Sequence, residues 1–449
     1  MLITKTVSAL TTHVEAGTKA NPKVLMDDCM IGITGCLVNL VVRSLDATKQ
    51  EKVLQDTFDL FVFNKPSGII LKNWEQVTEV FRPFGPQRIE QHVSCMTIFT
   101  CIIGGIRKEV FQVISHSARV LETDYCMQVK LPVEDISTFI TQIAVSIPKT
   151  PLFHKTSHLR LLATVINKWL PPSPSADLAS NELISNLMRP SPSSACFSED
   201  TIRIAFWVAK AITMKGDKLS DPLTLQLVDL LSDPTYGSMA ARGFAVLLGE
   251  DEFLNKQNHA VQRLLSKQKI FFLVIPKLVE AFKGSEQVIK PNYLVALSNI
   301  LRHIPSKIFL SSLPQLVPLL LQSLDLPTPM GDQGAVDVKL ATLSTLSITI
   351  LESANALQAH VSSLITRLLA TAAYYGDKGN PGAPPRIRKE ALRCLRIFPG
   401  TLRNELVLPY KRQVVRGLVV CLDDPKRGVR KEAVECRARW AQLDEPEED

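Results

Sequence analysis

The side chains best able to bind a metal are scattered through the sequence rather than gathered into one motif. His92 and Cys95 form an H-x-x-C pair on a predicted helix, and both side-chain types bind zinc. No second pair of ligands follows nearby, so a structural role for both residues is favoured over a metal site. The sequence therefore predicts no metal, no iron–sulfur cluster and no other cofactor.

The nine cysteines are odd in number, contain no C-x-x-C pair and mostly lie in apolar runs. They are Cys29, Cys36, Cys95, Cys101, Cys126, Cys196, Cys394, Cys421 and Cys436. This distribution favours buried free thiols in a reducing compartment over a disulfide framework. The first residues lack a basic-then-apolar signal pattern, and no uncharged apolar stretch of about 18 residues occurs. We therefore expect a cytoplasmic or nuclear protein that does not associate with membranes.

Motifs of catalytic sites are not found in the sequence. Neither G-x-x-x-x-G-K-[ST] nor G-x-G-x-x-G follows a predicted strand, and no H-E-x-x-H occurs. Gly104-Gly105 is a lone pair and predicts a helix break. The carboxylate pairs Asp27-Asp28 and Asp423-Asp424 lie at predicted helix starts or turns, where capping explains them. We expect no catalytic site, and an enzyme is the weakest functional hypothesis.

Basic residues are concentrated near the C-terminus. The whole chain has a net charge of +7, yet residues 386–440 carry 15 Lys or Arg against 6 Asp or Glu. Residues 444–449 then carry five acidic side chains. Such a basic region attracts acidic proteins or nucleic acid, and it is also compatible with simple solvated helix faces. It offers no aromatic stacking platforms, so direct nucleic-acid binding is disfavoured.

Four segments in the C-terminal third repeat one pattern and predict the elements that carry these charges. Each begins with Ile or Val and has Leu or Val five positions later, and the starts are 49, 49 and 42 residues apart. The segments are Ile289–Leu294, Val338–Leu343, Ile387–Leu392 and Val429–Val434. In the last two, apolar residues at offsets 0, 4, 7 and 11 form one helical stripe. These residues are Ile387, Ala391, Cys394 and Phe398, and Val429, Ala433, Cys436 and Trp440.

A second amphipathic run precedes each of these helices. Proline predicts the start of three of these first helices, at Ile275-Pro276, Leu313-Pro314 and Leu408-Pro409. Proline suits the first helical turn because the N–H that it lacks would have no hydrogen-bond partner there. A helix, a short Asp/Pro turn and a second helix, repeated every 40–50 residues, is typical of HEAT or armadillo repeats. The predicted fold class is all-α, an elongated α-solenoid of roughly nine or ten helix pairs.

The repeat pattern weakens towards the N-terminus, and four regions are predicted. They are divergent helical repeats over 1–170, a Pro/Ser-rich linker over 171–199, C-terminal HEAT repeats over 200–443 and an acidic tail over 444–449. Helices in the first two regions are expected near 27–45, 86–102, 133–147, 154–170 and 183–188. Insertions at 327–334 and 376–385 lengthen turns and are expected to be flexible loops or contact points.

Two arginines occupy the same place in the last two repeats. Arg388 and Arg430 directly follow the Ile or Val that starts the second helix. In HEAT repeats such a basic residue commonly pairs with an Asp of a neighbouring turn, and Asp424 is a candidate partner. We favour this structural ladder for both arginines, and direct contact with a partner protein is the alternative.

The last repeats resemble one particular family beyond the general HEAT pattern. The segments Leu408-Pro-Tyr-Lys-Arg-Gln-Val-Val-Arg416 and Leu422-Asp-Asp-Pro-Lys-Arg-Gly-Val-Arg-Lys-Glu-Ala-Val434 are similar to the C-terminal end of the HEAT-repeat adaptor of the cytosolic iron–sulfur targeting complex. That family was first named for DNA repair and transcription. Lys290–Leu294 and Leu343–Leu346 also resemble it. The likeness is specific over 286–443 and weaker over 222–285, and only compatible helices precede residue 200.

Members of this family are much longer, so the resemblance implies that the chain is their C-terminal half. The departures from the family pattern are the acidic tail and the 376–385 insertion.

The resemblance implies an adaptor that holds no cluster of its own. The family joins a carrier protein and a WD-repeat propeller protein and presents apo-clients such as DNA helicases, polymerases and primase for cluster insertion. Its C-terminal repeats dock the assembly partners. We therefore predict that five basic residues bind a partner: Arg412, Arg416, Lys426, Arg427 and Lys431. A generic scaffold of the nuclear-transport type and a nucleic-acid-binding solenoid are the alternatives.

Overall fold

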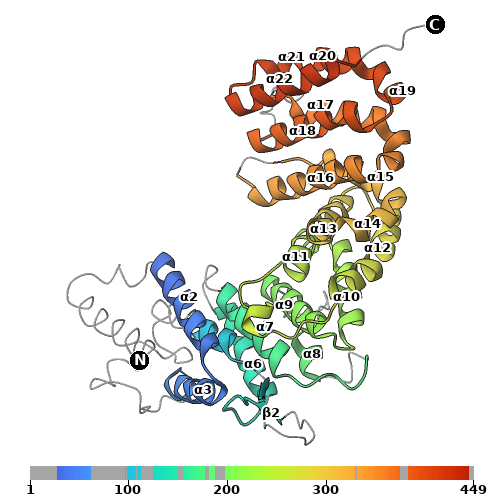
Figure 1. The fold of residues 1–449 in the computed structure, drawn as a ribbon. Helices are drawn as coiled ribbons and strands as arrows, with labels where there is room; N and C mark the ends of the chain where they lie inside the picture. The colour runs from blue at the N-terminus through green and yellow to red at the C-terminus, as the bar shows by residue number, and fades with distance from the viewer. Residues whose placement is uncertain are drawn as a thin grey trace, which may run out of the picture. The chain divides into compact units, whose positions relative to one another are not determined.

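A computed structural model describes residues 28–61, 97, 99–107, 109–112, 125–149, 155–176, 182–187, 198–328, 331–374 and 383–443. The chain divides into two units (Figure 1). The first unit comprises residues 1–223 and 250–266, and the second comprises residues 224–249 and 267–449. Each unit is described by itself below.

The first unit consists mainly of helices. Its elements are α2 (Asp28–Ser44), α3 (Ala47–Phe61), the helical residues 99–105, α6 (Ile136–Ser146), η2 (Ile147–Lys149), α7 (Lys155–Lys168), α8 (Glu182–Leu187), α9 (Glu199–Lys215) and η6 (Lys256–Asn258). Helix α7 packs between α6 and α9, and every residue from Leu161 to Lys168 is buried. The helices predicted near 27–45, 133–147, 154–170 and 183–188 are confirmed. Of the helix predicted over 86–102, residues 86–96 and 98 lie outside the described part.

A short hairpin departs from the purely helical prediction for this unit. Strands β1 (Glu109–Gln112) and β2 (Tyr125–Gln128) pair antiparallel, with Glu109 opposite Gln128 and Gln112 opposite Tyr125. Four residues per strand give too short an alternation to distinguish a strand from a helical turn. The all-α solenoid class is correct, and this hairpin is an addition to it.

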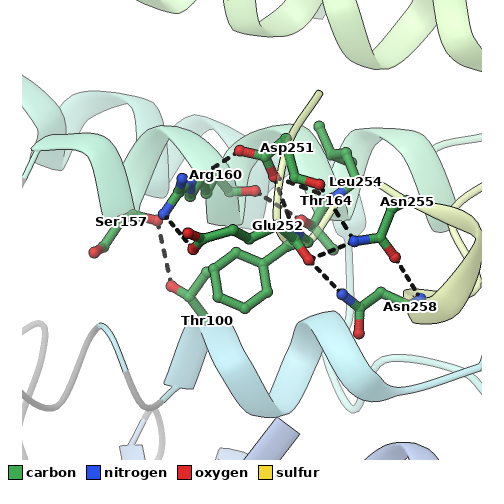
Figure 2. Close-up of polar contacts among 10 residues, drawn as sticks. Thr100, Ser157, Arg160, Thr164, Asp251, Glu252, Leu254, Asn255 and Asn258 are labelled. Carbon is green, nitrogen blue, oxygen red and sulfur yellow. Dashed lines mark hydrogen bonds and ion pairs between the residues drawn. The ribbon is translucent and has the colours of Figure 1, made fainter. Parts of the chain in front are cut away.

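One loop is attached to the first unit by the guanidinium of Arg160 on α7 (Figure 2). Arg160 Nε donates to Asp251 at 2.9 Å, and its Nη1 donates to Glu252 at 3.2 Å. The other oxygen of Asp251 accepts the backbone N–H groups of Phe253 and Leu254. The Asp251 side chain is 3% exposed, so this pair is shielded from solvent on one side. These contacts explain why residues 250–266 belong with α7.

A buried asparagine fastens the far end of the same loop. The Asn167 amide donates to the carbonyls of Ala211 and Val261 at 3.1 and 3.0 Å, and its oxygen accepts the Val261 N–H at 2.7 Å. Asn167 is fully buried, so these hydrogen bonds satisfy polar groups that water does not reach. The loop is thereby tied to both α7 and α9.

Lys168, the last residue of α7, is fully buried and caps a neighbouring helix end. Its Nζ donates to the carbonyls of Ile103, Gly104 and Ile106 at 3.5, 2.8 and 2.7 Å. The helix ends at Gly105, as the Gly-Gly pair predicts. Desolvation lowers the pKa of Lys168 to about 7.

The second unit contains the predicted repeat. Helix α10 (Ser220–Asp229) crosses into it from the first unit. The remaining elements are η5 (Leu230–Ser232), α11 (Gly237–Leu248), α12 (Ser266–Gly284), α13 (Lys290–His303), α14 (Ser306–Phe309), η7 (Leu310–Ser312), α15 (Leu313–Leu324), α16 (Gln333–Glu352), η8 (Ala354–His360), α17 (Val361–Ala372), α18 (Pro385–Thr401), α19 (Asn404–Val407), η10 (Leu408–Tyr410), α20 (Lys411–Gly417), α21 (Val419–Leu422) and α22 (Arg427–Ala441).

The second helices of successive pairs stack in chain order. Helix α11 packs on α13, α13 on α16, α16 on α18 and α18 on α22 (Figure 1). The first helices form a parallel layer, in which α15 contacts α17 and α17 contacts α20. This arrangement confirms the helix-pair solenoid predicted from the repeated segments.

The two predicted apolar stripes form the core of the last two pairs. All eight residues at offsets 0, 4, 7 and 11 in α18 and α22 are at most 1% exposed. The rings of Phe398 and Trp440 lie 6.3 Å apart, and Trp440 Nε1 donates to the carbonyl of Leu395 at 2.8 Å. Each large buried apolar side chain contributes about 1.5–3 kcal/mol, so these stripes hold α22 on α18.

Proline positions follow the prediction at two sites and contradict it at a third. Pro314 and Pro409 lie in the first turns of α15 and η10. Pro276, in contrast, lies inside α12 rather than at its start. Pro276 is tolerated because it lies on the exposed face of α12. It lacks the N–H that would bond the carbonyl of Phe272 four residues earlier, but Phe272 is half-exposed, so water can bond that carbonyl instead.

Two helical stretches have the length and apolar composition needed to cross a membrane. They are Ser306–Leu324 and Gln333–Glu352, and 50% and 56% of their most apolar windows are buried. Helices α15 and α16 pack on each other and on the neighbouring pairs. The solenoid core therefore accounts for their apolar residues.

Several predicted segments lie wholly or partly outside the described residues. These are His92 and Cys95, parts of the 171–199 linker, parts of the 327–334 and 376–385 insertions, and the acidic tail. The predicted boundary at residues 199–200 falls within the first unit, because α9 packs on α7.

Candidate partner-binding surface

The last two helix pairs are joined by a buried ion pair between Arg388 on α18 and Asp424 in the turn before α22. Arg388 Nε donates to Asp424 Oδ2 at 2.8 Å, and its second terminal nitrogen donates to Oδ1 at 3.0 Å. The two side chains are 3% and 0% exposed. Oδ1 also accepts the Lys426 N–H at 2.8 Å, and the Arg388 guanidinium lies 5.0 Å from the ring centre of Tyr374. A buried, bidentate pair of this kind fixes the turn rather than contacting a partner.

Arg430 approaches the same turn but does not bind the Asp424 carboxylate. Its Nη1 donates to the backbone carbonyl of Asp424 at 2.6 Å. The structure thus brings Arg388, Asp424 and Arg430 together around one turn, with different roles for the two arginines.

A charge network along α18 and α22 was not predicted from the sequence. Glu432 on α22 is 8% exposed, and its carboxylate accepts a hydrogen bond from Arg393 Nε at 3.1 Å. The same carboxylate also forms ion pairs with Arg396 at 3.5 Å and with Lys389 at 3.8 Å. Partial burial acts to lower the pKa of Arg393, but hydrogen bonds to Glu390 and Glu432 outweigh it, and the pKa is raised. The shared Arg-Lys-Glu-Ala motif was the available signal, because it places Glu432 on the face of α22 that meets α18.

A groove lies between the C-terminal halves of α18 and α22. Its volume is about 780 Å³. It is lined by Arg396, Ile397, Gly400, Thr401, Glu435, Ala438, Arg439 and Gln442. Arg396 is already paired with Glu435.

The five residues predicted to bind a partner are all exposed on the last helix pair. Lys431 lies 4.0 Å from Glu435, whereas Arg412, Arg416, Lys426 and Arg427 make no ion pair with a carboxylate in the described part of the chain. Unpaired, exposed cations are free to meet acidic groups of a partner.

These five residues do not form one patch. Helix α20 packs against α22, which returns after the turn, and Lys411 Nζ donates to the carbonyl of Leu443. Arg412 therefore lies beside the end of α22, whereas Lys426 and Arg427 lie beside its start. The structure places the predicted site residues at the two ends of one helix pair.

Exposed valines on the same helix pair were missed by the sequence analysis. Val419 and Val420 on α21 are each 48% exposed, and Val434 on α22 is 57% exposed. These valines lie outside the buried apolar stripes. Their position relative to the stripes is the signal that could have predicted their exposure. Apolar residues among basic ones are common at protein–protein interfaces.

The cysteines of the described residues offer no metal site. No group of three or more His, Cys, Asp or Glu in this part of the chain is placed to hold an ion. Burial raises the pKa of Cys394 and of Cys436 to about 12, and Cys101 and Cys421 are also buried, whereas Cys36 is exposed. These buried thiols are part of the core.

Comparison with known proteins identifies the family. A family model described as "RNAPII transcription regulator C-terminal", MMS19_C, matches residues 2–399. The chain belongs to the MMS19 family. It corresponds to the C-terminal region of that family, as the resemblance in the last repeats predicts.

Relatives span several eukaryotic groups. The MMS19 nucleotide excision repair protein homolog of Xenopus laevis is 30% identical over 99% of this chain and 39% of its own length. The human homolog is 38% identical over 54% of this chain and 22% of its own length. The DNA repair/transcription protein mms19 of Schizosaccharomyces pombe is 27% identical over 94% of this chain and 38% of its own length. The chain thus spans about two fifths or less of these relatives.

The MMS19 likeness reaches further towards the N-terminus than the sequence analysis recognised. The family model begins at residue 2, whereas the motifs identified above lie within 286–443. The repeats of the first 200 residues lack the regular register, so a single sequence gives no pattern there to compare.

Solved structures with some likeness include the karyopherins Kap95p and Kap121p. Kap95p is 12% identical with a TM-score of 0.38, covering 97% of this chain and 53% of its own. Kap121p bound to RanGTP is 11% identical with a TM-score of 0.32, covering 97% and 47%. Scores this low support no functional argument.

Proposed function

We propose that this MMS19-family chain is a non-catalytic adaptor of cytosolic iron–sulfur cluster assembly, acting in the cytoplasm and nucleus. It docks the carrier protein and the WD-repeat propeller protein, and it presents apo-clients of DNA metabolism, such as helicases, polymerases and primase. Family membership and the solenoid fold support a scaffold, and the names of the relatives associate them with DNA repair and transcription. Stacked repeats commonly serve as extended binding surfaces.

One observation carries the docking proposal. Four exposed cations of the last helix pair, Arg412, Arg416, Lys426 and Arg427, have no carboxylate partner in the described part of the chain. Beside Lys426, the Arg388–Asp424 pair is buried and internally satisfied. The four exposed cations are therefore available to a partner without breaking this internal pair.

The test reverses two of these charges. The Lys426→Glu, Arg427→Glu variant is expected to recover less carrier and propeller protein in a pull-down, because rim charges set the association rate. Helix content should stay unchanged, since exposed substitutions usually alter stability by only about 0.5 kcal/mol. Lys283→Glu, Lys307→Glu is the matched control, with the same charge change at exposed positions of earlier pairs.

Equal recovery by the wild type and the Lys426/Arg427 variant at physiological salt would refute a docking role for the turn. Equal loss in both variants would show that only net charge matters. Direct nucleic-acid binding would instead give an affinity that falls steeply with salt, and we expect no such binding.

A further inference from the structure

One position of the repeat lies between successive second helices. Five residues after the start of the repeated segment, the residue is Leu294 in α13, Leu343 in α16, Leu392 in α18 and Val434 in α22. The three leucines are at most 4% exposed, and each of their helices is covered by the second helix of the next pair. Val434 is 57% exposed, because α22 is the last helix of the described residues and no following pair covers it. The outer side of α22 thus exposes a position that packing buries in the three preceding pairs.

Arginines lie on either side of Val434 along α22. Arg437 occupies the position of Leu395, which is fully buried in α18, and it is exposed without an ion pair in the described residues. Arg430 occupies the position of Arg388, whose carboxylate partner comes from the turn of the following pair. Arg430 itself bonds a backbone carbonyl and makes no ion pair with a carboxylate in the part of the chain that is described. This side of α22 therefore presents one apolar position between two cations.

The first helix of the pair adds a second valine on the same side. A side chain at Gly417 would meet Leu369 of α17, so this face of α20 is turned towards the preceding pair. Val419 lies two residues, or about 200°, further round and therefore points away from α17. It is 48% exposed, and its helix α21 packs against α22. We call the surface formed by Val419, Arg430, Val434 and Arg437 the outer flank.

A helix is the element that suits the outer flank, because helices cover the equivalent side of α13, α16 and α18. Arg430, Val434 and Arg437 are spaced i, i+4 and i+7, so they form one stripe along α22. A covering helix needs an apolar side chain opposite Val434 and carboxylates opposite both arginines. A second copy of the chain would bring like charges together, and a nucleic-acid backbone would leave both valines uncovered.

We propose that the outer flank binds an amphipathic helix of a partner protein, with apolar side chains over the two valines and Asp or Glu beside Arg430 and Arg437. The inference rests on the proposed function, in which the last pairs dock a partner, and it specifies the chemistry of the docked segment. The helix stacks on α22 as α22 stacks on α18, and it gives Arg430 the carboxylate that Asp424 gives Arg388. The Arg388–Asp424 pair stays intact, because it is buried between α18 and the turn before α22.

A stapled, fluorescent helical peptide with a leucine stripe flanked by glutamates tests the flank without any partner protein. In fluorescence anisotropy, the wild-type chain should bind it saturably at physiological salt. A version with lysines in place of the glutamates should bind at least about tenfold more weakly. Val434→Gln should weaken binding of the glutamate peptide about three- to tenfold, because roughly half a valine side chain is no longer buried. Arg437→Glu should weaken it by at least as much.

Two substitutions elsewhere are the matched controls. Val145→Gln on α6 changes a valine that is 56% exposed, and Arg302→Glu on α13 reverses an exposed arginine. Both should bind the glutamate peptide as the wild type does. Equal affinities for all four variants, or no saturable binding by the wild type, would overturn the proposal.

Pull-down of the carrier and propeller proteins then shows whether a partner uses the flank. The Val434→Gln, Arg437→Glu variant should recover less of them than the wild type does. Full recovery by a variant that no longer binds the peptide would reject docking at this flank and leave the proposed function intact. If the wild type recovers neither protein, the proposed function fails, whereas peptide binding still decides whether the flank accepts an acidic helix. A dimer in sedimentation that Val434→Gln abolishes would assign the flank to a second copy and refute the inference.

Discussion

Replacing Asp424 by alanine removes one half of the buried ion pair that joins α18 to the turn before α22. The substitution leaves the Arg388 guanidinium 3% exposed and without its bidentate partner. It also removes the acceptor of the Lys426 N–H. Because Asp424 is not among the residues with a positive φ, alanine fits the backbone there, and the loss is electrostatic rather than steric.

The expected magnitude follows from burial. Removing one partner of a buried pair costs about 3–5 kcal/mol, because the remaining charge is left unpaired away from water. The pair Arg367–Asp325 is the natural comparison within the same unit. Its side chains are 32% and 53% exposed, although Arg367 Nε lies only 2.9 Å from Asp325. An exposed pair contributes about 0.2–1 kcal/mol.

Amide hydrogen exchange of the full chain, read on peptides of α18 and α22, measures the effect. Repeats open locally, so the Asp424→Ala variant should exchange about two to four orders of magnitude faster there. Asp325→Ala should accelerate exchange in its own pair by less than about tenfold. If both variants accelerate exchange equally, burial does not determine the strength of this pair, and the assignment of Arg388 and Asp424 to the internal framework fails.

Three further outcomes are expected. Burial lowers the pKa of Lys168 to about 7 in the folded chain. Between about pH 7 and 10 the unfolded chain therefore binds a proton that the folded chain has lost, so stability against urea should rise with pH over this range. The Lys168→Met substitution should flatten this rise. Asn167→Ala should destabilise the first unit by about 1–3 kcal/mol and speed hydrogen exchange of residues 250–266. Iodoacetamide should label Cys36 rapidly in the native chain, whereas Cys394 should be labelled only in denaturant.

The features predicted from the sequence are those that depend on local periodicity. The stripe from Ile387 to Phe398 repeats from Val429 to Trp440, and a helix period alone places each set on one buried face. The partnership of Arg388 with Asp424 was anticipated because the arginine recurs at one position of the repeat. In a regular repeat each unit contacts only its neighbours, so contacts between residues far apart in the sequence can be predicted from the repeat register.

The features not predicted depend on contacts that no repeat encodes. Arg160 meets Asp251 across 91 positions, and nothing near either residue indicates the other. The β1–β2 hairpin is too short for its alternation to be distinguished from helical turns. Pro276 is tolerated inside α12 only because its position faces solvent, which the sequence around it does not reveal.

The basic residues of the last pairs fall into two groups, those paired with carboxylates and those that are exposed and unpaired in the described residues. Arg388 forms a buried ion pair with Asp424. Arg393 pairs with Glu432, and Arg396 pairs with Glu435. Of the other basic side chains of the last pair, six are exposed and make no ion pair in the described residues: Arg412 and Arg416 on α20, Lys426 and Arg427 at the turn after α21, and Arg437 and Arg439 on α22. In the proposed docking, a partner with an acidic face meets these exposed charges without breaking any internal pair, so docking would cost little reorganisation.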